Sequence, residues 1–263
     1  MIKFCSLYSG SSGNCIFISK DNTKVLIDAG LSGKRIIEAL HSIGENPAEL
    51  SAILVTHEHS DHTRGVGILS RKFNVPIYAN ERTWNAMERE IGPVSLQNKV
   101  CFNTDQEFDI GKICVKAFHI PHDAAEPVGY NFFIENKKIT LATDIGHITN
   151  SLLAYLEASD LLFLESNHDI EMLKVGPYPW PLKKRIMGDS GHLSNEMAGK
   201  VIAYFAGLGM RRFILAHLSK ENNFPELAYQ TVLNALQEKK ICVGTDVTLE
   251  VALRDRTGSI YHI

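Results

Sequence analysis

The first thirty residues contain three apolar stretches, IKFCSLY, CIFIS and KVLIDAG, and the turn-forming run SGSSGN separates the first two. Short apolar runs bounded by Gly and Ser are typical of strands joined by tight turns. This region therefore predicts a hairpin meander.

The following segment, SGKRIIEALHSIG, has a different period. Its apolar residues Ile36, Ile37 and Leu40 recur at the spacing of one helix face. A serine precedes them as a candidate N-cap, and Gly44 provides a stop. The segment predicts an amphipathic helix.

The rest of the chain shows the same two periods. The first half continues with the strands AILV, VPIYA, ICVKAFHI, GYNFFIE and KKITLATD and the helix ERTWNAMEREIG. Beyond residue 145 the helices NSLLAYLEA, SNEMAGKVIAYFAG and PELAYQTVLNALQEKK alternate with the strands LLFLES and RFILAH, and a last strand pair begins at Val247. This α/β pattern predicts two sheets with helices packed outside them, an αββα four-layer sandwich, although periodicity alone also fits one mixed α/β sheet.

Composition favours a single globular unit. The chain has 263 residues, of which 44% are hydrophobic and 22% charged, which is ordinary for a protein with a sizeable core. No low-complexity run or linker rich in Pro and Gly divides it. We therefore predict one domain over residues 1–263.

The net charge of −3, from 27 basic and 30 acidic residues, argues against a broad basic surface that binds nucleic acid nonspecifically. An anionic substrate is not excluded. Divalent ions in a cleft, together with the short basic clusters PLKKR and MRR, would outweigh this deficit locally.

The N-terminus and the cysteines indicate the cellular compartment. The opening MIKFCSLYSGSSGN lacks the apolar core of a signal peptide, and no run approaches the ~18 apolar residues of a membrane helix. The five cysteines are scattered and form no CxxC pair, so neither a disulfide framework nor a cysteine zinc site is indicated. We expect a cytoplasmic protein with reduced thiols and no membrane partner.

Residues 56–63 read THEHSDHT directly after the apolar run AILV, and three of the eleven histidines fall within six positions. A strand that ends in a tight loop would project His57 and His59 to one side. Asp61 and His62 would then turn back over the same point. Imidazole and carboxylate groups are ligands for zinc and related ions, so this loop predicts a metal site; the alternative is a solvated polar loop.

Other strands also end in histidines or acids. The segments are FHIPHDAAEPVGY with His119 and His122, LATDIGH with Asp144 and His147, LFLESNHD with Glu165 and His168, GDSGHLSN with His192, and FILAHLS with His217. One such ending is as often a core residue as a ligand. Five of them fit a metal site along one edge of two sheets, because strand termini converge there. The residues themselves do not choose His122 over His119.

The ordered set THEHSDH, PHDAAEPVGY, ATDIG, LESNHD, GHLSN and AHLS resembles the metallo-β-lactamase superfamily, whose signature is HxHxDH followed by a later His, a bridging Asp and a final His. The resemblance covers essentially the whole chain and implies the αββα sandwich of the metallo-β-lactamase fold. The segments LES, GHLS and AHLS are similar to the phosphodiesterase and tRNA 3′-processing branch. SGSSGN, HDAAEPVGY, ESNHD and GPYPWPLKKRI look most like the small bacterial DNA exonucleases of the YycJ (WalJ) type.

The resemblance implies two divalent metal ions, and the donors suit zinc or manganese. The ligands implied for the first ion are His57, His59 and His122, and those implied for the second are Asp61, His62 and His217. Asp144 would bridge the two ions, and Asp28 would brace the histidine loop by hydrogen bonds. His119 then belongs to its strand.

By similarity to the tRNA-processing branch, His192 is the general acid for the leaving oxygen, and Glu165 is the carboxylate that orients it. Asp61 would orient the attacking water or take its proton. His192 as a metal ligand is the alternative. The expected substrate contacts, with Trp180 as a stacking surface, are His168, Trp180, Lys183 and Lys184; packing of Trp180 and solvated lysines would explain these last three equally well.

These inferences predict a metal-dependent phosphodiesterase, namely an exodeoxyribonuclease that degrades DNA. The finer expectations are cleavage from 5′ to 3′ and a role in DNA repair.

The alternatives fit the sequence less well. Thioester or lactam hydrolysis would need no Glu–His acid pair. A tRNA 3′-processing endonuclease generally carries an arm that binds tRNA, and the interval from Asp144 to His217 has no long insertion rich in Gly, Pro or Lys. Diiron chemistry normally places Glu where His59 stands, and a non-catalytic scaffold would lack some of the ligands.

Overall fold

A computed structural model describes all 263 residues, and their contacts divide them into two compact units. The first unit comprises residues 1–119, 124–136 and 253–263. The second comprises residues 120–123 and 137–252. The single domain expected from composition stays a prediction.

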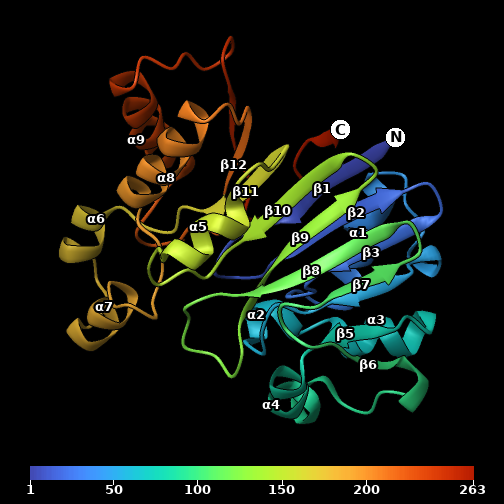
Figure 1. The fold of residues 1–263 in the computed structure, drawn as a ribbon. Helices are drawn as coiled ribbons and strands as arrows, with labels where there is room; N and C mark the ends of the chain where they lie inside the picture. The colour runs from blue at the N-terminus through green and yellow to red at the C-terminus, as the bar shows by residue number, and fades with distance from the viewer. The chain divides into compact units, whose positions relative to one another are not determined.

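The first unit contains a seven-stranded sheet with the order β14-β1-β2-β3-β4-β5-β6. Its strands are β1 (Ile2–Tyr8), β2 (Cys15–Lys20), β3 (Thr23–Ile27), β4 (Ala52–Leu54), β5 (Ile77–Ala79), β6 (Lys99–Cys101) and β14 (Ile260–His262). The strands β1, β2 and β3 pair antiparallel, which confirms the predicted meander, and β3 to β6 pair parallel. Figure 1 shows β1, β2 and β3 side by side at the blue end of the chain.

Helices cover one face of this sheet. They are α1 (Gly33–Ser42), α2 (Ser60–Thr63), α3 (Val66–Phe73) and α4 (Glu81–Ile91), with 3₁₀ turns at Pro47–Glu49 and Leu96–Asn98. The predicted N-cap of α1 is confirmed, since the Ser32 side chain accepts from the Arg35 amide. Ile36 and Leu40 of α1 join Phe17 and Leu26 of the sheet in one buried cluster.

The same unit also contains three antiparallel strands outside this sheet. They are β7 (Glu107–Ile110), β8 (Ile113–His119) and β9 (Val128–Ile134).

The second unit is built on four parallel strands, β10 (Lys137–Ala142), β11 (Leu161–Glu165), β12 (Arg212–Ala216) and β13 (Thr248–Val251). Its helices are α5 (Asn150–Leu156), α6 (Ile170–Val175), α7 (Trp180–Ile186), α8 (Asn195–Gly207) and α9 (Pro225–Glu238). Figure 1 shows α8 and α9 packed side by side, and the two share many contacts. Because the strands are parallel, all their carboxyl ends lie at one edge. None of the helices in either unit is both long and apolar enough to cross a bilayer.

Two features differ from the sequence expectations. The last two strands do not pair with each other: β13 extends the parallel strands beside β12, whereas β14 pairs with β1. The backbone groups of each strand are satisfied at an existing sheet edge, so a terminal hairpin is not needed. The helices α3, α6 and α7 were not expected, because Gly67 lies within α3, α6 spans only six residues, and Pro181 lies within α7. Pro179 and Pro181 stand at the N-terminus of α7, where proline is tolerated.

Candidate metal centre

The histidine loop gathers four potential ligands in the first unit. His57 follows β4, His59 is the N-cap of the short helix α2, and Asp61 and His62 lie on that helix. The Nε2 of His57 lies 3.1 Å from the Nδ1 of His59, and the Nε2 of His62 lies 3.6 Å from a carboxylate oxygen of Asp61. The ring centroids of His57 and His62 are 4.1 Å apart. The loop thus brings together the four side chains that its spacing predicted.

Asp28 braces this loop, as the sequence predicted. One carboxylate oxygen accepts from the Thr56 amide at 2.8 Å, and the other accepts from the Thr56 hydroxyl and lies 2.7 Å from the Nδ1 of His62. Asp28 itself is buried and has a positive φ of 58°. A carboxylate on Nδ1 fixes the tautomer of a histidine and leaves Nε2 as the donor for a metal.

Asn14 is a second brace that the sequence did not reveal. Its side-chain amide nitrogen lies 3.1 Å from the Nε2 of His62, and its backbone amide donates to the Asp61 carbonyl at 2.8 Å. Gly30 permits this approach, because a Cβ there would lie 1.6 Å from the Asp61 carbonyl oxygen. The only sequence signal was the run SGSSGN, which we interpreted as a turn.

The second unit gathers the other predicted ligands at the carboxyl ends of its parallel strands. Asp144 follows β10, Glu165 ends β11, and His217 follows β12. The potential ligand atoms of these three residues and of His192 all lie within 4.8 Å of one another. His122 joins them, with its Nε2 3.9 Å from a carboxylate oxygen of Asp144. His119, by contrast, is an exposed strand residue bonded to the Pro127 carbonyl, as predicted.

Glu165 is the central acid of this cluster. It is fully buried, and its Oε1 lies 2.8 Å from the Nδ1 of both His192 and His217. Its Oε2 accepts from the amides of Ile145 and Leu193. Burial acts to raise the pKa of Glu165, but the neighbouring histidines outweigh it and hold that pKa below its ordinary range. The carboxylate is therefore ionised and positioned by four donors.

His192 has the opposite balance. Burial acts to lower its pKa, but the charge and hydrogen bond of Glu165 outweigh burial and raise it. For His122, burial is the largest influence, and it lowers the pKa of the ring. The shifts in pKa therefore favour the protonated form of His192 and the neutral form of His122, and the neutral form is the one that can bind a metal ion.

The backbone at these ligands is unusual. Asp144 and His217 have positive φ angles of 60° and 55°, a region that residues other than glycine rarely occupy. Asp and His tolerate it better than most residues do, and such conformations cluster at functional sites.

A buried amide network supports the same edge. The side-chain carbonyl of Asn195 accepts from the Ser166 hydroxyl, and the side-chain amide of Asn223 donates to the carbonyls of Ser166 and Asn167. Asn167 in turn donates to the His217 carbonyl at 2.9 Å. These residues hold the turns after β11 and β12 in place. In the sequence they are visible only as polar residues that follow apolar strands.

The predicted substrate residues fall into two groups. His168 is buried beside the first turn of α8, and its carbonyl accepts from the Asn195 amide. Trp180 and Lys184 lie exposed on α7. Lys183 is buried, and its Nζ donates to the Lys174 carbonyl at 2.7 Å. Lys183 can therefore contact a ligand through its Nζ only by giving up that bond.

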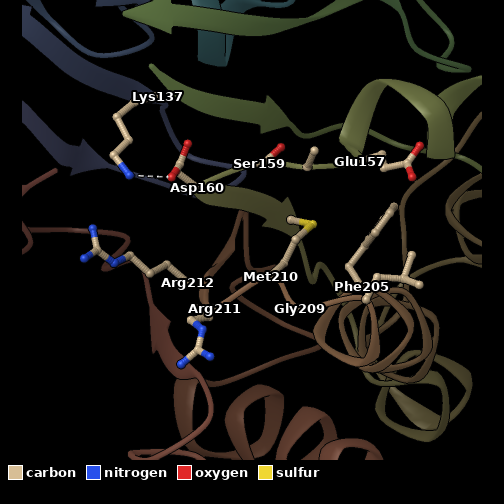
Figure 2. Close-up of a pocket in the computed structure, with 11 residues that line it drawn as sticks. Lys137, Glu157, Ser159, Asp160, Phe205, Gly209, Met210, Arg211 and Arg212 are labelled. Atoms are coloured by element: carbon tan, nitrogen blue, oxygen red, sulfur yellow. Dashed lines mark hydrogen bonds and ion pairs between the residues drawn. The ribbon is translucent and has the colours of Figure 1, made fainter. Parts of the chain in front are cut away.

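A pocket of about 430 Å³ lies at the opposite, amino ends of the same strands. Figure 2 shows Lys137 paired with Asp160 there, and Arg211 and Arg212 beside the start of β12. It contains no histidine and no cysteine. This end of the sheet therefore offers charge but no metal-binding chemistry.

The donor sets suit metal ions. Each unit places histidine nitrogens and carboxylate oxygens together, and Asp28, Asp144, Glu165 and His217 are buried where an unbalanced charge would be costly. Histidine and carboxylate donors of this kind fit zinc or manganese. The identity and number of the ions stay predictions.

Comparison with known proteins agrees with this geometry. The family model described as a β-lactamase superfamily domain matches residues 23–218. The chain is 45% identical over 244 residues to an exodeoxyribonuclease YycJ of Bacillus anthracis, covering 92% of each chain. It is 43% identical over 246 residues to an exodeoxyribonuclease WalJ of Streptococcus pneumoniae, covering 93% of this chain and 91% of that one.

Solved structures establish the fold. The metallo-β-lactamase fold protein YhfI of Bacillus subtilis aligns with a TM-score of 0.74 at 14% identity, covering 99% of this chain and 98% of that one. The short form of human tRNase Z aligns with a TM-score of 0.65 at 17% identity, covering 98% and 99%. The αββα sandwich predicted from the sequence is thereby confirmed.

Proposed function

Because the chain belongs to the metallo-β-lactamase superfamily, we propose that it is a metal-dependent exodeoxyribonuclease. Likeness to exodeoxyribonucleases over more than nine tenths of the chain supports the substrate. The observation that carries the chemistry is the buried Glu165 bonded to His192 beside Asp144. Hydrolysis of a thioester or a lactam would not require this acid pair.

We further propose that two divalent ions are bound as the sequence motif implies. His57, His59 and His122 would hold one ion, and Asp61, His62 and His217 would hold the other. Asp144 would be shared between them. Support comes from the order of these residues in the family motif and from the carboxylates at the Nδ1 atoms of His62 and His217, which favour an unprotonated Nε2. At His62, a metal ion would take the place of the Asn14 side-chain amide that lies 3.1 Å from this nitrogen.

When bound, such a metal pair supplies an activated water and neutralises charge on the phosphate. The residues of the chain supply the rest of the chemistry. Asp61 orients the water or accepts its proton. His192 donates a proton to the leaving oxygen, and Glu165 holds the ring in place and favours its protonated form.

The finer features of the proposal concern the DNA. We propose cleavage from the 5′ end toward the 3′ end and a role in DNA repair, as the resemblance to the YycJ (WalJ) type suggested. Trp180 and Lys184 are exposed on α7 and would contact the strand by stacking and charge. Such phosphate contacts would make activity weaker at high salt.

The test uses the purified protein treated with a chelator and then supplied with manganese or zinc. Labelled single-stranded and duplex DNA, with and without 5′-phosphate, is compared with a tRNA precursor and a thioester. The proposal predicts release of nucleotides from a DNA end only after metal is restored. Efficient cleavage of the thioester or the tRNA precursor, with all DNA left intact, would contradict it.

A further inference from the structure

A pocket of about 540 Å³ in the second unit lies directly beside the Glu165–His192 pair. Its walls come from the loop after β10, the turn leading into α6, the end of α7 and the first turn of α8. The apolar part of its lining consists of Ile148, Ile170, Met187, Leu193 and Met197. His192 forms one side of the pocket, so whatever occupies it lies next to the proton donor.

His168 is the polar feature of this lining. The residue is only 2% exposed, and its Nδ1 is buried with no hydrogen-bond partner. Leaving a buried polar atom unpaired is costly, so native proteins seldom retain such an atom without a use for it. Burial also lowers the pKa of His168 to about 4, so the ring is neutral at pH 7 and has one donor and one acceptor nitrogen.

We propose that this pocket binds the nucleobase of the terminal nucleotide, the one whose sugar carries the leaving oxygen. The inference rests on the proposed function. A nucleobase has two flat apolar faces, which suit methionine and isoleucine side chains, and a polar edge, which would give the His168 ring a partner. Because a neutral histidine both donates and accepts, it can pair with the edge of any base, and the pocket would hold all four.

The position of the pocket determines which phosphodiester bond would be cleaved. With the 5′-terminal nucleoside seated beside His192, hydroxide attacks the phosphorus that links it to the second nucleotide. The bond from phosphorus to the terminal O3′ breaks, and O3′ takes the proton of His192. The products are the terminal nucleotide with a free 3′-hydroxyl and a strand one residue shorter with a 5′-phosphate. A pocket with room for one nucleoside would make cleavage exonucleolytic.

The test compares the first release step on matched single-stranded oligonucleotides. One carries a normal residue at the 5′ end, one carries an abasic tetrahydrofuran residue there, and one carries the abasic residue at the tenth position. The wild-type protein should release the terminal abasic residue about tenfold more slowly than the normal one. The internal abasic residue should leave the first step unchanged.

Met197→Ala and His168→Asn should reduce this terminal penalty to less than about threefold, because the variants lack a contact with the base. Met197 is 39% exposed, so its replacement tests the pocket even if His168→Asn fails to fold. Leu208→Ala, at the exposed far end of α8, is the control and should keep the full penalty. Bound metal, measured by elemental analysis, should be equal in every variant.

Two outcomes overturn the proposal and are distinguishable. In the first, the wild type degrades DNA from an end but releases a terminal abasic residue as fast as a normal one, or Met197→Ala keeps the full penalty. The pocket then does not bind the base, and only this inference fails. If the wild type with metal degrades no DNA at all, the proposed function fails, and the pocket proposal fails with it.

Discussion

The two ends of the parallel strands β10, β11 and β12 differ sharply in chemistry. At the amino ends, Lys137 pairs with Asp160, and the exposed Arg211 and Arg212 lie beside them (Figure 2). At the carboxyl ends, Asp144 and Glu165 are buried. An ionised side chain that stays in contact with water has little free-energy cost. A buried carboxylate, by contrast, is destabilising unless hydrogen-bond donors or metal ions compensate its charge. The comparison favours the carboxyl ends as the location of the proposed site.

The same substitution at the two ends should give the largest contrast. Asp144→Asn should reduce DNA degradation to background and lower the bound metal, because its carboxylate would contact both ions. Asp160→Asn removes an acid from the amino ends and should preserve both properties. Elemental analysis and end-labelled DNA measure the two effects. Equal metal content in wild type and Asp144→Asn would refute the bridging role.

The acid pair should give the next largest effect. His192→Ala should lose roughly 10²–10⁴-fold in turnover, which is the usual contribution of a general acid, while retaining both metals. Glu165→Gln should act through the same group, so the double variant should be little worse than His192→Ala alone. Single-turnover rates on DNA test this, and additive losses would show that the two residues act separately.

The amide network should matter for stability. Asn223→Ala removes the donor to the Ser166 carbonyl and the acceptor of the Asn195 side-chain amide. Each buried group left unpaired costs about 1–3 kcal/mol, so the free energy of unfolding should fall by at least that amount. Asn234→Ala, exposed on α9, is the matched control. Equal denaturation midpoints for the two variants would contradict the bracing role.

His168 should make stability depend on pH. Burial lowers the pKa of His168 from 6.5 to about 4. Between these two pH values, His168 is mostly protonated in the unfolded chain and mostly neutral in the folded chain. The corresponding stability is present above pH 6.5 and is lost as the pH falls toward 4. At pH 5 this loss amounts to about 2 kcal/mol.

Denaturant unfolding at pH 7 and pH 5, with chelator present throughout, tests this dependence. His168→Asn should lose about 2 kcal/mol less than the wild type between the two pH values. His41→Asn, exposed on α1, should behave as the wild type does. The same loss in all three proteins would mean that His168 is not held neutral.

The smallest effect is expected at the amino ends. Arg212→Ala changes an exposed side chain, and such changes usually alter stability by no more than about 0.5 kcal/mol. DNA degradation should change by less than about twofold. A large loss of activity would locate part of the DNA path at this end of the strands, and the two ends would then differ less in function than we expect.

Much of the fold, and the gathering of the candidate ligands at strand ends, could be predicted from the sequence, because both depend on local patterns. The period of the apolar residues gave the strands, and the ends of parallel strands must converge, so Asp144 and His217 could be placed at one edge. Asn14 and Asn223 could not be recognised as braces. Their partners are distant in the sequence, and asparagine beside a turn is common for local reasons.

The same limit explains the segment PWPLKKR. Its lysines look alike in the sequence, but the tertiary structure buries Lys183 against the Lys174 carbonyl and leaves Lys184 exposed. His168 is a similar case, since burial without a partner is a property of the folded chain alone. Residue type predicted that it would lie near the site, and only the packing shows the pocket that it lines.

The most direct test of the central claim compares leaving groups. The rates of wild type and His192→Ala are measured on DNA and on a phosphodiester whose leaving group is an acidic phenol, with bound metal determined in parallel. If His192 protonates the leaving oxygen, the variant keeps its metal, loses roughly 10²–10⁴-fold on DNA and loses far less on the phenol ester, whose oxygen departs without a proton. An equal loss on both substrates, or the loss of a metal ion from the variant, would show that His192 is a ligand or a structural residue.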